Sequence, residues 1–341
     1  MSLLLLVYGS LLYGSTMEFG TSELLRGLSF VLGLEESSDQ TSEAILILRL
    51  RRTFVALGVG AALSYSGVLL QGIFRNGLAS PSVLGISTGA SVGASVGILI
   101  VAGYGPSMVV SSAVERAPLF VTTLSFVGAF LTTLLVSALG TRSGRISVPT
   151  LLLAGIAVNT CLGAFLVAMQ SFAMSDNLEV AKALVSWTFG SLEDHGNARI
   201  AVVWCGLGIA MGVLPFVARE LDLFASGEED AAALGVNTTR VKFMALGAAS
   251  LAAASAVAVA GQIAFLGLVV PHLLRMWVGN SHKRLLPLSL LAGAAFLLAA
   301  DLGQRMLLGH ASLRPGVLMS LVGGPFFLFL LMRSRKELRT W

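Results

Sequence analysis

FMALGAASLAAASAVAVAGQIAFLGLVVPHLL, the stretch from Phe243 to Leu274, contains no Asp, Glu, Lys or Arg. A helix that crosses the hydrocarbon core of a bilayer needs about 20 residues. The stretch is therefore too long for one crossing, and it is too apolar for a soluble loop. We expect a membrane-crossing helix, a turn near Gly261 and a short second helix.

The composition of the whole chain agrees with a membrane protein. Of its 341 residues, 55% are hydrophobic and 12% are charged, whereas soluble domains have roughly 25% charged residues. The net charge is +4, but no stretch interleaves basic and aromatic residues, so we expect no nucleic-acid binding. Cys161 and Cys205 lie inside apolar runs and the four histidines are dispersed. This pattern predicts neither a disulfide framework nor a metal site.

Similar charge-free runs recur along the chain and mark further membrane-crossing helices. Besides Phe243–Leu274, which counts as two, they are the N-terminal MSLLLLVYGSLLYGSTM, Thr53–Phe74, Asn76–Val114, Ala117–Thr141, Ile146–Ser175, Ile200–Ala218, Leu285–Ala300 and Pro315–Met332. A β-barrel is excluded because its strands alternate over about ten residues. We therefore predict an all-α polytopic membrane protein with about ten spans in a single domain, residues 1–341.

Two polar stretches interrupt this pattern. Glu18–Arg52 is long enough for a short amphipathic helix, and Asp176–Arg199 contains the apolar island ALVSWTFGSL, which predicts a short helix at the membrane interface.

The basic residues predict an orientation. Lys and Arg favour cytoplasmic loops, and with both termini in the cytoplasm more than half of the 22 basic residues lie inside. The cluster Arg49, Arg51 and Arg52 then lies outside, against the rule. This cluster needs another explanation.

ASGEEDAAALGV, from Ala225 to Val236, is cytoplasmic in this orientation. Gly227 can begin a short helix, and the acids from Glu228 onward favour the positive end of its dipole. Gly235 suits the position after the last helical residue. The segment is either a solvated loop helix or a docking surface whose alanines, Ala231 and Ala232, permit close approach to a soluble partner. No Walker A pattern occurs, so any ATP that drives this protein must bind another polypeptide.

Several smaller motifs have structural interpretations. GISTG, residues 85–89, matches the nucleophile elbow of serine hydrolases, but it opens a membrane helix and Ser87 has no apparent Asp or His partner. Ser87 and Thr88 are better explained as helix caps. Gly89, Gly93 and Gly97 share one helix face and predict close helix packing.

Asp301 and Arg305 are four residues apart and can pair across one helical turn. Charges inside a membrane are costly and usually functional.

Four stretches, in this order, resemble one known family. They are LRLRRTFVALGVGAALSYSGVLLQGIFRNGLASPSVLGISTGASVG, SGEEDAAALGV, AVAVAGQIAFLGLVVPHLLRMWVGNSHKRLLPLSLLAGAAFLLAADLGQR and GVLMSLVGGPFFLFLL. The ordered set is similar to permease subunits of bacterial ABC importers for iron–siderophores, haem and cobalamin. The resemblance implies ten helices and a homodimer around a central translocation pathway in the cytoplasmic (inner) membrane. It also implies two cytoplasmic ATPase subunits that bind ATP and Mg, a binding protein outside, surrounding membrane lipid, and no cofactor in this chain.

The resemblance also assigns residues. Segment 219–242 matches the cytoplasmic coupling segment, in which Gly227, Glu228, Ala231, Ala232 and Gly235 would meet the ATPase. Arg49 and Arg52 match the two arginines of the family's LRLPR stretch, and Arg305 matches the arginine after the AD of span nine. In relatives these arginines meet acids of the binding protein, which would explain the outside cluster.

The cytoplasmic gate of the family corresponds to SVPT, that is Ser147, Val148, Pro149 and Thr150. This segment differs from the cobalamin importer. Arg51 and Gly77 also stand where the family has prolines. These departures leave the cargo open, with ferric siderophore as the first expectation, followed by haem and cobalamin. The sequence does not decide whether the second permease subunit is an identical chain or a paralogue.

Two alternatives come from other classes. An ion-coupled secondary transporter would need buried ionisable groups to bind the coupling ion. An intramembrane serine hydrolase using Ser87 would need partners that the sequence does not offer.

Overall fold

The computed structural model describes residues 2–14, 20–31, 40–104, 116–142, 145–193, 196–308 and 313–334. These residues are almost entirely helical, as predicted. The first half contains α1 (Ser2–Leu12), α2 (Thr21–Val31), α3 (Gln40–Phe74), the 3₁₀ turn η1 (Pro81–Leu84), α4 (Ile86–Val101), α6 (Ala117–Gly140), and the hairpin β1 (Thr141–Arg142) and β2 (Arg145–Ile146). The second half contains α7 (Val148–Asp176), α8 (Leu178–Thr188), α9 (Asn197–Met211), α10 (Leu214–Phe224), α11 (Glu228–Ala233), α12 (Thr238–Ala260), α13 (Leu266–Val278), α14 (His282–Leu308) and α15 (Pro315–Ser334).

The helices account for the predicted membrane spans. Five are long and apolar enough to cross a bilayer, namely α3, α6, α7, α12 and α14, and the pair α9 and α10, bent by 58°, forms a sixth. Four shorter apolar helices, α1, α4, α13 and α15, complete the ten predicted segments. The chain is therefore a multi-pass membrane protein.

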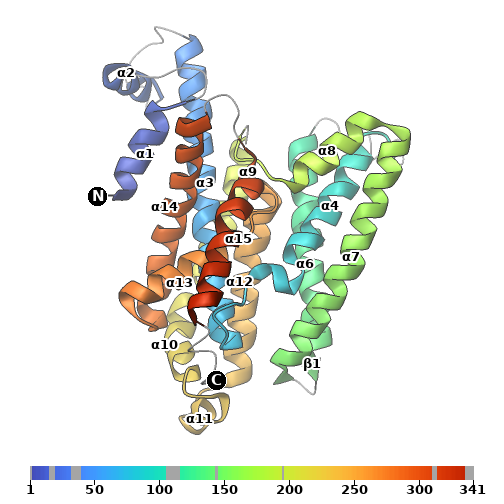
Figure 1. Cartoon of the computed structure of the whole chain (residues 1–341), viewed down its shortest axis with the longest axis vertical. Helices are drawn as coiled ribbons and strands as arrows, with labels where there is room; N and C mark the ends of the chain where they lie inside the picture. The colour runs from blue at the N-terminus through green and yellow to red at the C-terminus, as the bar shows by residue number, and fades with distance from the viewer. Residues whose placement is uncertain are drawn as a thin grey trace.

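Helix α3 is the central element of the bundle, and most of its apolar part is buried among the other helices. It packs against α12, α13 and α14, as Figure 1 shows for its blue ribbon beside α14. Glycine permits the closest of these contacts, because a Cβ at Gly60 would overlap the carbonyl oxygen of Gly293, and one at Gly67 would overlap that of Gly267. Helix α3 begins at Gln40 rather than at Thr53, where the charge-free run starts. The sequence places Arg49 and Arg52 in a loop before the helix, but both lie within α3 because they find hydrogen-bond partners inside the bundle.

A second group of helices, α4, α6, α7 and α8, forms the right-hand part of Figure 1. Helix α4 lies against α6 along the face that carries Gly89, Gly93 and Gly97. A Cβ at Gly89 would lie 2.7 Å from the carbonyl oxygen of Gly128, and one at Gly93 would overlap that of Leu124. Small residues on this face therefore set how closely the two backbones approach.

The predicted capping of α4 was wrong. The residue before the helix is Gly85, with φ of 77°, and no side chain caps the helix. The Thr88 hydroxyl instead has two acceptors within hydrogen-bond distance, the Gly85 carbonyl (3.1 Å) and the amide oxygen of Asn159. The side-chain amide of Asn159 on α7 thus binds the Thr88 hydroxyl, which the sequence predicted to cap α4.

The predicted break near Gly261 is confirmed. Helix α12 ends at Ala260, Gly261 has φ of 75°, and α13 begins at Leu266. The two predicted short polar helices are also present as α2 and α8. Helix α8 lies at one end of the bundle and α11 projects from the other (Figure 1).

Candidate transport and docking sites

A buried carboxylate organises the arginines at the α8 end. Asp301, only 1% exposed, accepts hydrogen bonds from Arg52 through Nε (3.0 Å) and Nη2 (2.7 Å). Arg305 Nη2 lies 3.1 Å from Oδ2 of the same carboxylate, the oxygen that also accepts from Arg52 Nε, which confirms the predicted pairing across one helical turn. The carboxylate of Glu193, whose side chain is 59% exposed, lies 2.5 Å from Nη1 of Arg52, the guanidinium nitrogen that does not contact Asp301. The sequence did not reveal the pair between Arg52 and Asp301, because 249 positions separate them.

Arg49 and Arg305 hold the end of α1. Arg49 Nη1 donates to the carbonyls of Leu11 (2.8 Å) and Leu12 (2.9 Å). Arg305 donates to the Ser10 hydroxyl (2.7 Å). The last carbonyls of a helix lack intrahelical donors, and cations there also favour the negative end of the dipole. The arginines therefore fix α1 against α3 and α14.

This arrangement corrects the expected exposure of the three arginines on an outer face. Arg49 and Arg305 are each 6% exposed, and the side chain of Arg52 is 14% exposed. The end of α1 covers Arg49 and Arg305, whose guanidinium groups donate to its carbonyls, whereas Arg52 is held by Asp301 and Glu193. Their role in docking a binding protein stays a prediction, and Arg52 is the most accessible of the three.

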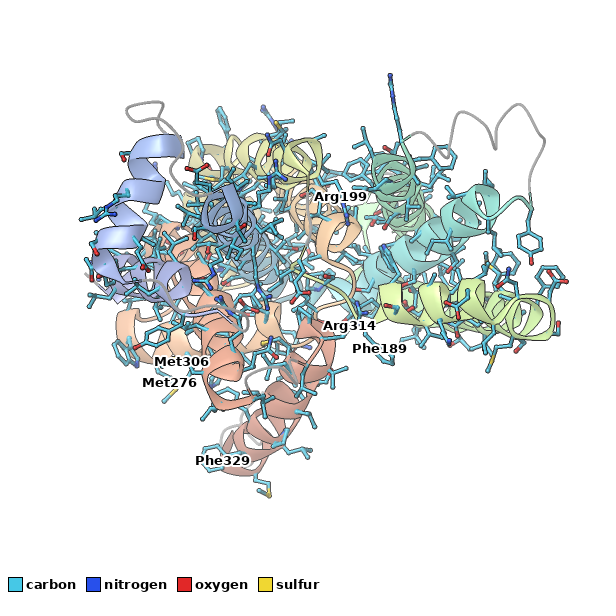
Figure 2. All side chains as sticks on the ribbon, turned by 90° about the horizontal axis from the view of Figure 1, so that it is seen from above. Phe189, Arg199, Met276, Met306, Arg314 and Phe329 are labelled. Atoms are coloured by element: carbon cyan, nitrogen blue, oxygen red, sulfur yellow. The ribbon has the colours of Figure 1, made fainter. Side chains whose placement is uncertain are left out.

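A cavity of about 270 Å³ lies at the same end of the molecule, between α8, α12 and the start of α15. Arg199 and Arg314 line it, and no residue among its described lining carries a carboxylate. Arg199 Nη2 donates to the Val259 carbonyl at 3.0 Å, and Arg314 Nη1 lies 3.5 Å from the Gly190 carbonyl. Figure 2, which looks down on this end, shows both arginines in the middle of the molecule.

Two further cavities adjoin this one. A largely apolar cavity of about 460 Å³ shares Arg199 and Trp187 with it, and a smaller one shares Arg314 and extends to Arg52. Sequence reasoning missed Arg199 and Arg314, because each stands at the edge of an apolar run and has the appearance of an ordinary loop charge.

The predicted coupling segment, residues 219–242, folds around a short helix. Helix α11 is preceded by Gly227, with φ of 138°, and followed by Gly235, with φ of 86°. Ala231 is fully buried, since α11 packs through this side against its neighbours α10 and α12. Ala232 is exposed, and Leu234 is 66% exposed. The assignment of Ala231 to a partner contact is thus corrected, and the outward face is formed by residues 232–234.

Glu228 is also turned toward its own chain. Its two carboxylate oxygens lie 2.6 and 2.7 Å from Nζ of Lys242, which is 3% exposed. Glu229 and Asp230 are exposed and have no ion pair among the described residues. The resemblance implied that Glu228 would meet the ATPase, whereas its carboxylate is paired within the chain and Glu229 and Asp230 are the exposed acids of α11.

The predicted gate segment lies where the hairpin passes into α7. Ser147 is the residue before the helix, and its backbone N–H donates to the Gly140 carbonyl at 3.0 Å. The Thr150 hydroxyl donates to that of Ser147 at 2.9 Å. Val148 is half-buried, whereas Pro149 and Thr150 are exposed. The hairpin and α11 lie at the same end of the bundle (Figure 1).

A bundle of ten apolar segments, with an acidic helix projecting at one end and arginine-lined cavities at the other, defines a membrane-embedded transport protein. The chain belongs to the FecCD transport family, whose sequence profile matches residues 2–333.

Similar proteins agree with this family. The cobalamin import system permease protein of Halobacterium salinarum is 38% identical over 89% of this chain and 78% of its own length. The hemin transport system permease protein of Yersinia pestis is 39% identical over 86% of this chain and 84% of its own length.

A solved structure of an inward-facing conformation of a metal-chelate type ABC transporter has a TM-score of 0.73 and 28% identity. It covers 92% of this chain, and this chain covers 97% of it. The homologues are thus permease subunits of ABC importers.

Proposed function

We propose that this chain imports a negatively charged metal chelate, a ferric siderophore or haem, as one of two permease subunits driven by a separate ATPase. The observation that carries the cargo class is the cavity lined by Arg199 and Arg314. Positive groups in a site favour anionic ligands and disfavour others. Related permeases are named for hemin and for cobalamin, and cobalamin lacks the carboxylates that would match two guanidinium groups.

The two ends of the molecule have different roles in this proposal. The end that carries Arg52 and the arginine-lined cavity faces the binding protein outside the cytoplasmic (inner) membrane. The α11 end faces the ATPase in the cytoplasm, and both termini are cytoplasmic. The outward face of α11, residues 232–234, contacts the ATPase, and the ATP cycle alternates access to the pathway between two permease subunits. Such coupling needs no catalytic group in this chain.

Docking of the binding protein can be tested at Arg52. An incoming acid would replace the exposed Glu193 on the outer fork of Arg52. Arg52→Gln should therefore weaken binding-protein affinity, whereas Glu193→Gln should strengthen it by removing the competitor. Both effects should shrink as salt is added, because salt screens exposed charges. Equal affinity of both variants and the parent at low salt would exclude this docking role.

Uptake by proteoliposomes tests the cargo class. The permease is reconstituted with its ATPase and binding protein, and uptake of a carboxylate-type ferric siderophore, haem and cobalamin is measured with ATP inside. We expect ATP-dependent uptake of one of the anionic chelates, several-fold lower in Arg314→Gln and largely retained in Arg314→Lys. Arg26→Gln on α2, an exposed arginine outside the cavities, is the matched control. Uptake of cobalamin alone would refute the cargo class but leave the importer role standing.

The ion-coupled alternative has lost its support. The family to which the chain belongs contains ABC permeases. Asp301, a buried carboxylate that could have bound a coupling ion, is already paired with Arg52 and Arg305. Uptake that continues without ATP and stops when the ion gradient is collapsed would restore this alternative.

A further inference from the structure

A buried lysine connects three elements at the α11 end. Lys242 lies near the start of α12, and its Nζ contacts both carboxylate oxygens of Glu228 on α11, at 2.6 and 2.7 Å. The same Nζ donates to the backbone carbonyl of Ile146 on β2 at 3.1 Å. An ammonium group has three donors, so Glu228 and Ile146 account for all of them.

The burial of Lys242 makes this connection strong. A buried charge is costly unless it is paired and hydrogen-bonded, and removing one partner leaves that cost uncompensated. Lys242 is 3% exposed, whereas the side chain of Glu228 is 50% exposed. The ammonium group of Lys242 therefore cannot exchange Glu228 for water. When α11 is displaced, either the ion pair moves as a unit or it breaks and leaves Lys242 unpaired.

The contact with Ile146 links α11 to the predicted gate segment. Ile146 is 4% exposed and directly precedes Ser147, the first residue of the gate segment 147–150. The covalent routes from α11 to the rest of the bundle pass Gly227, with φ of 138°, toward α10 and Gly235, with φ of 86°, toward α12. Both routes can bend at a glycine, whereas the route through Glu228, Lys242 and Ile146 consists of three short contacts.

We propose that Lys242 is a positioning residue that transmits displacement of α11 to the gate segment. The ATPase moves α11, Glu228 draws the ammonium group, and the Ile146 carbonyl carries the movement into the first turn of α7. This inference rests on the proposed function, and it adds a specific non-covalent link between the coupling helix and the pathway.

Lys242→Met in the complete transporter tests the link, because methionine keeps much of the apolar stem and removes the charge. We expect the ATPase to co-purify with this variant and to hydrolyse ATP. The amount of cargo imported per ATP should fall about 5- to 150-fold, which is the factor that typical coupling free energies produce. Lys242→Arg keeps the charge and should recover part of the loss. Lys283→Gln, at an exposed cation at the start of α14, outside the coupling segment and without an ion pair among the described residues, should behave as the parent.

A readout at the gate separates this role from a purely structural one. The rate at which a maleimide labels Val148→Cys is measured with and without nucleotide. We expect the rate to depend on nucleotide in the parent background and to lose this dependence with Lys242→Met. A folded Lys242→Met variant that keeps the parental labelling response and the parental import per ATP would overturn the proposal.

Glu228→Gln decides the question if Lys242→Met fails to reach the membrane. This variant removes the charge of Glu228 at a half-exposed side chain. It should fold because the amide oxygen of glutamine can still accept a hydrogen bond from the buried Lys242 ammonium group, which limits the cost of leaving it without a counter-ion. Parental import per ATP in Glu228→Gln would overturn the link. Failure of the parent complex to import any chelate would instead count against the proposed function, and the nucleotide response at Val148→Cys would still test the link.

Discussion

Asp301→Asn should destabilise the protein far more than Glu193→Gln, although both remove a negative partner of Arg52. Asp301 is 1% exposed and accepts hydrogen bonds from Arg52 at 2.7 and 3.0 Å. It also pairs with Arg305 at 3.1 Å. Asparagine preserves the volume but leaves two largely buried guanidinium groups facing each other without the carboxylate. Breaking a buried ion pair in this way costs about 3–5 kcal/mol.

Glu193 provides the matched control. Its side chain is 59% exposed, and a single contact of 2.5 Å joins it to Arg52. Exposed ion pairs contribute about 0–1 kcal/mol, so Glu193→Gln should remain close to the parent. The difference between the two variants therefore isolates the effect of burial on the same arginine.

The free energy of unfolding can be followed in detergent, by denaturant titration with tryptophan fluorescence, alongside the fraction of monodisperse protein after heating. Asp301→Asn should shift the midpoint strongly and Glu193→Gln only slightly. The reasoning is refuted if the two variants lose the same small amount of stability, because the buried carboxylate would then contribute no more than an exposed one.

Three further predictions concern other parts of the bundle. Ala231→Trp should lower the free energy of unfolding by about 1–3 kcal/mol through overpacking, whereas Ala232→Trp should give normal membrane levels and lose ATPase co-purification; the reverse pattern would contradict the assigned faces of α11. Gly93→Leu should separate α4 from α6 and lower thermal stability, whereas Gly163→Leu, where a side chain meets open space, should not; equal melting temperatures would exclude close packing at Gly93. Val148→Cys should cross-link to a second permease subunit in at least one nucleotide state, and a folded dimer without cross-links in any state would argue against a gate at this segment.

The class of fold and the order of its elements follow from the amino-acid sequence alone. A bilayer offers no water to backbone groups, so each crossing segment must satisfy its hydrogen bonds internally as a helix. Length and lack of charge are then sufficient to locate the spans, including the break at Gly261. The short helix α11 was also predictable, because Gly227 and Gly235 end it locally and its acids favour its first turn.

The contacts of the charged residues, in contrast, depend on how the helices pack in three dimensions. The charge-free rule placed Arg49 and Arg52 in a loop, whereas α3 continues through them, because carbonyls of α1 and the carboxylate of Asp301 compensate their burial. The buried side of α11 and the contact of Lys242 with Ile146 were equally hidden. A guanidinium, carboxylate or ammonium group can be buried only beside a suitable partner. That partner is brought near by helix packing across long stretches of chain, which no local pattern in the sequence records.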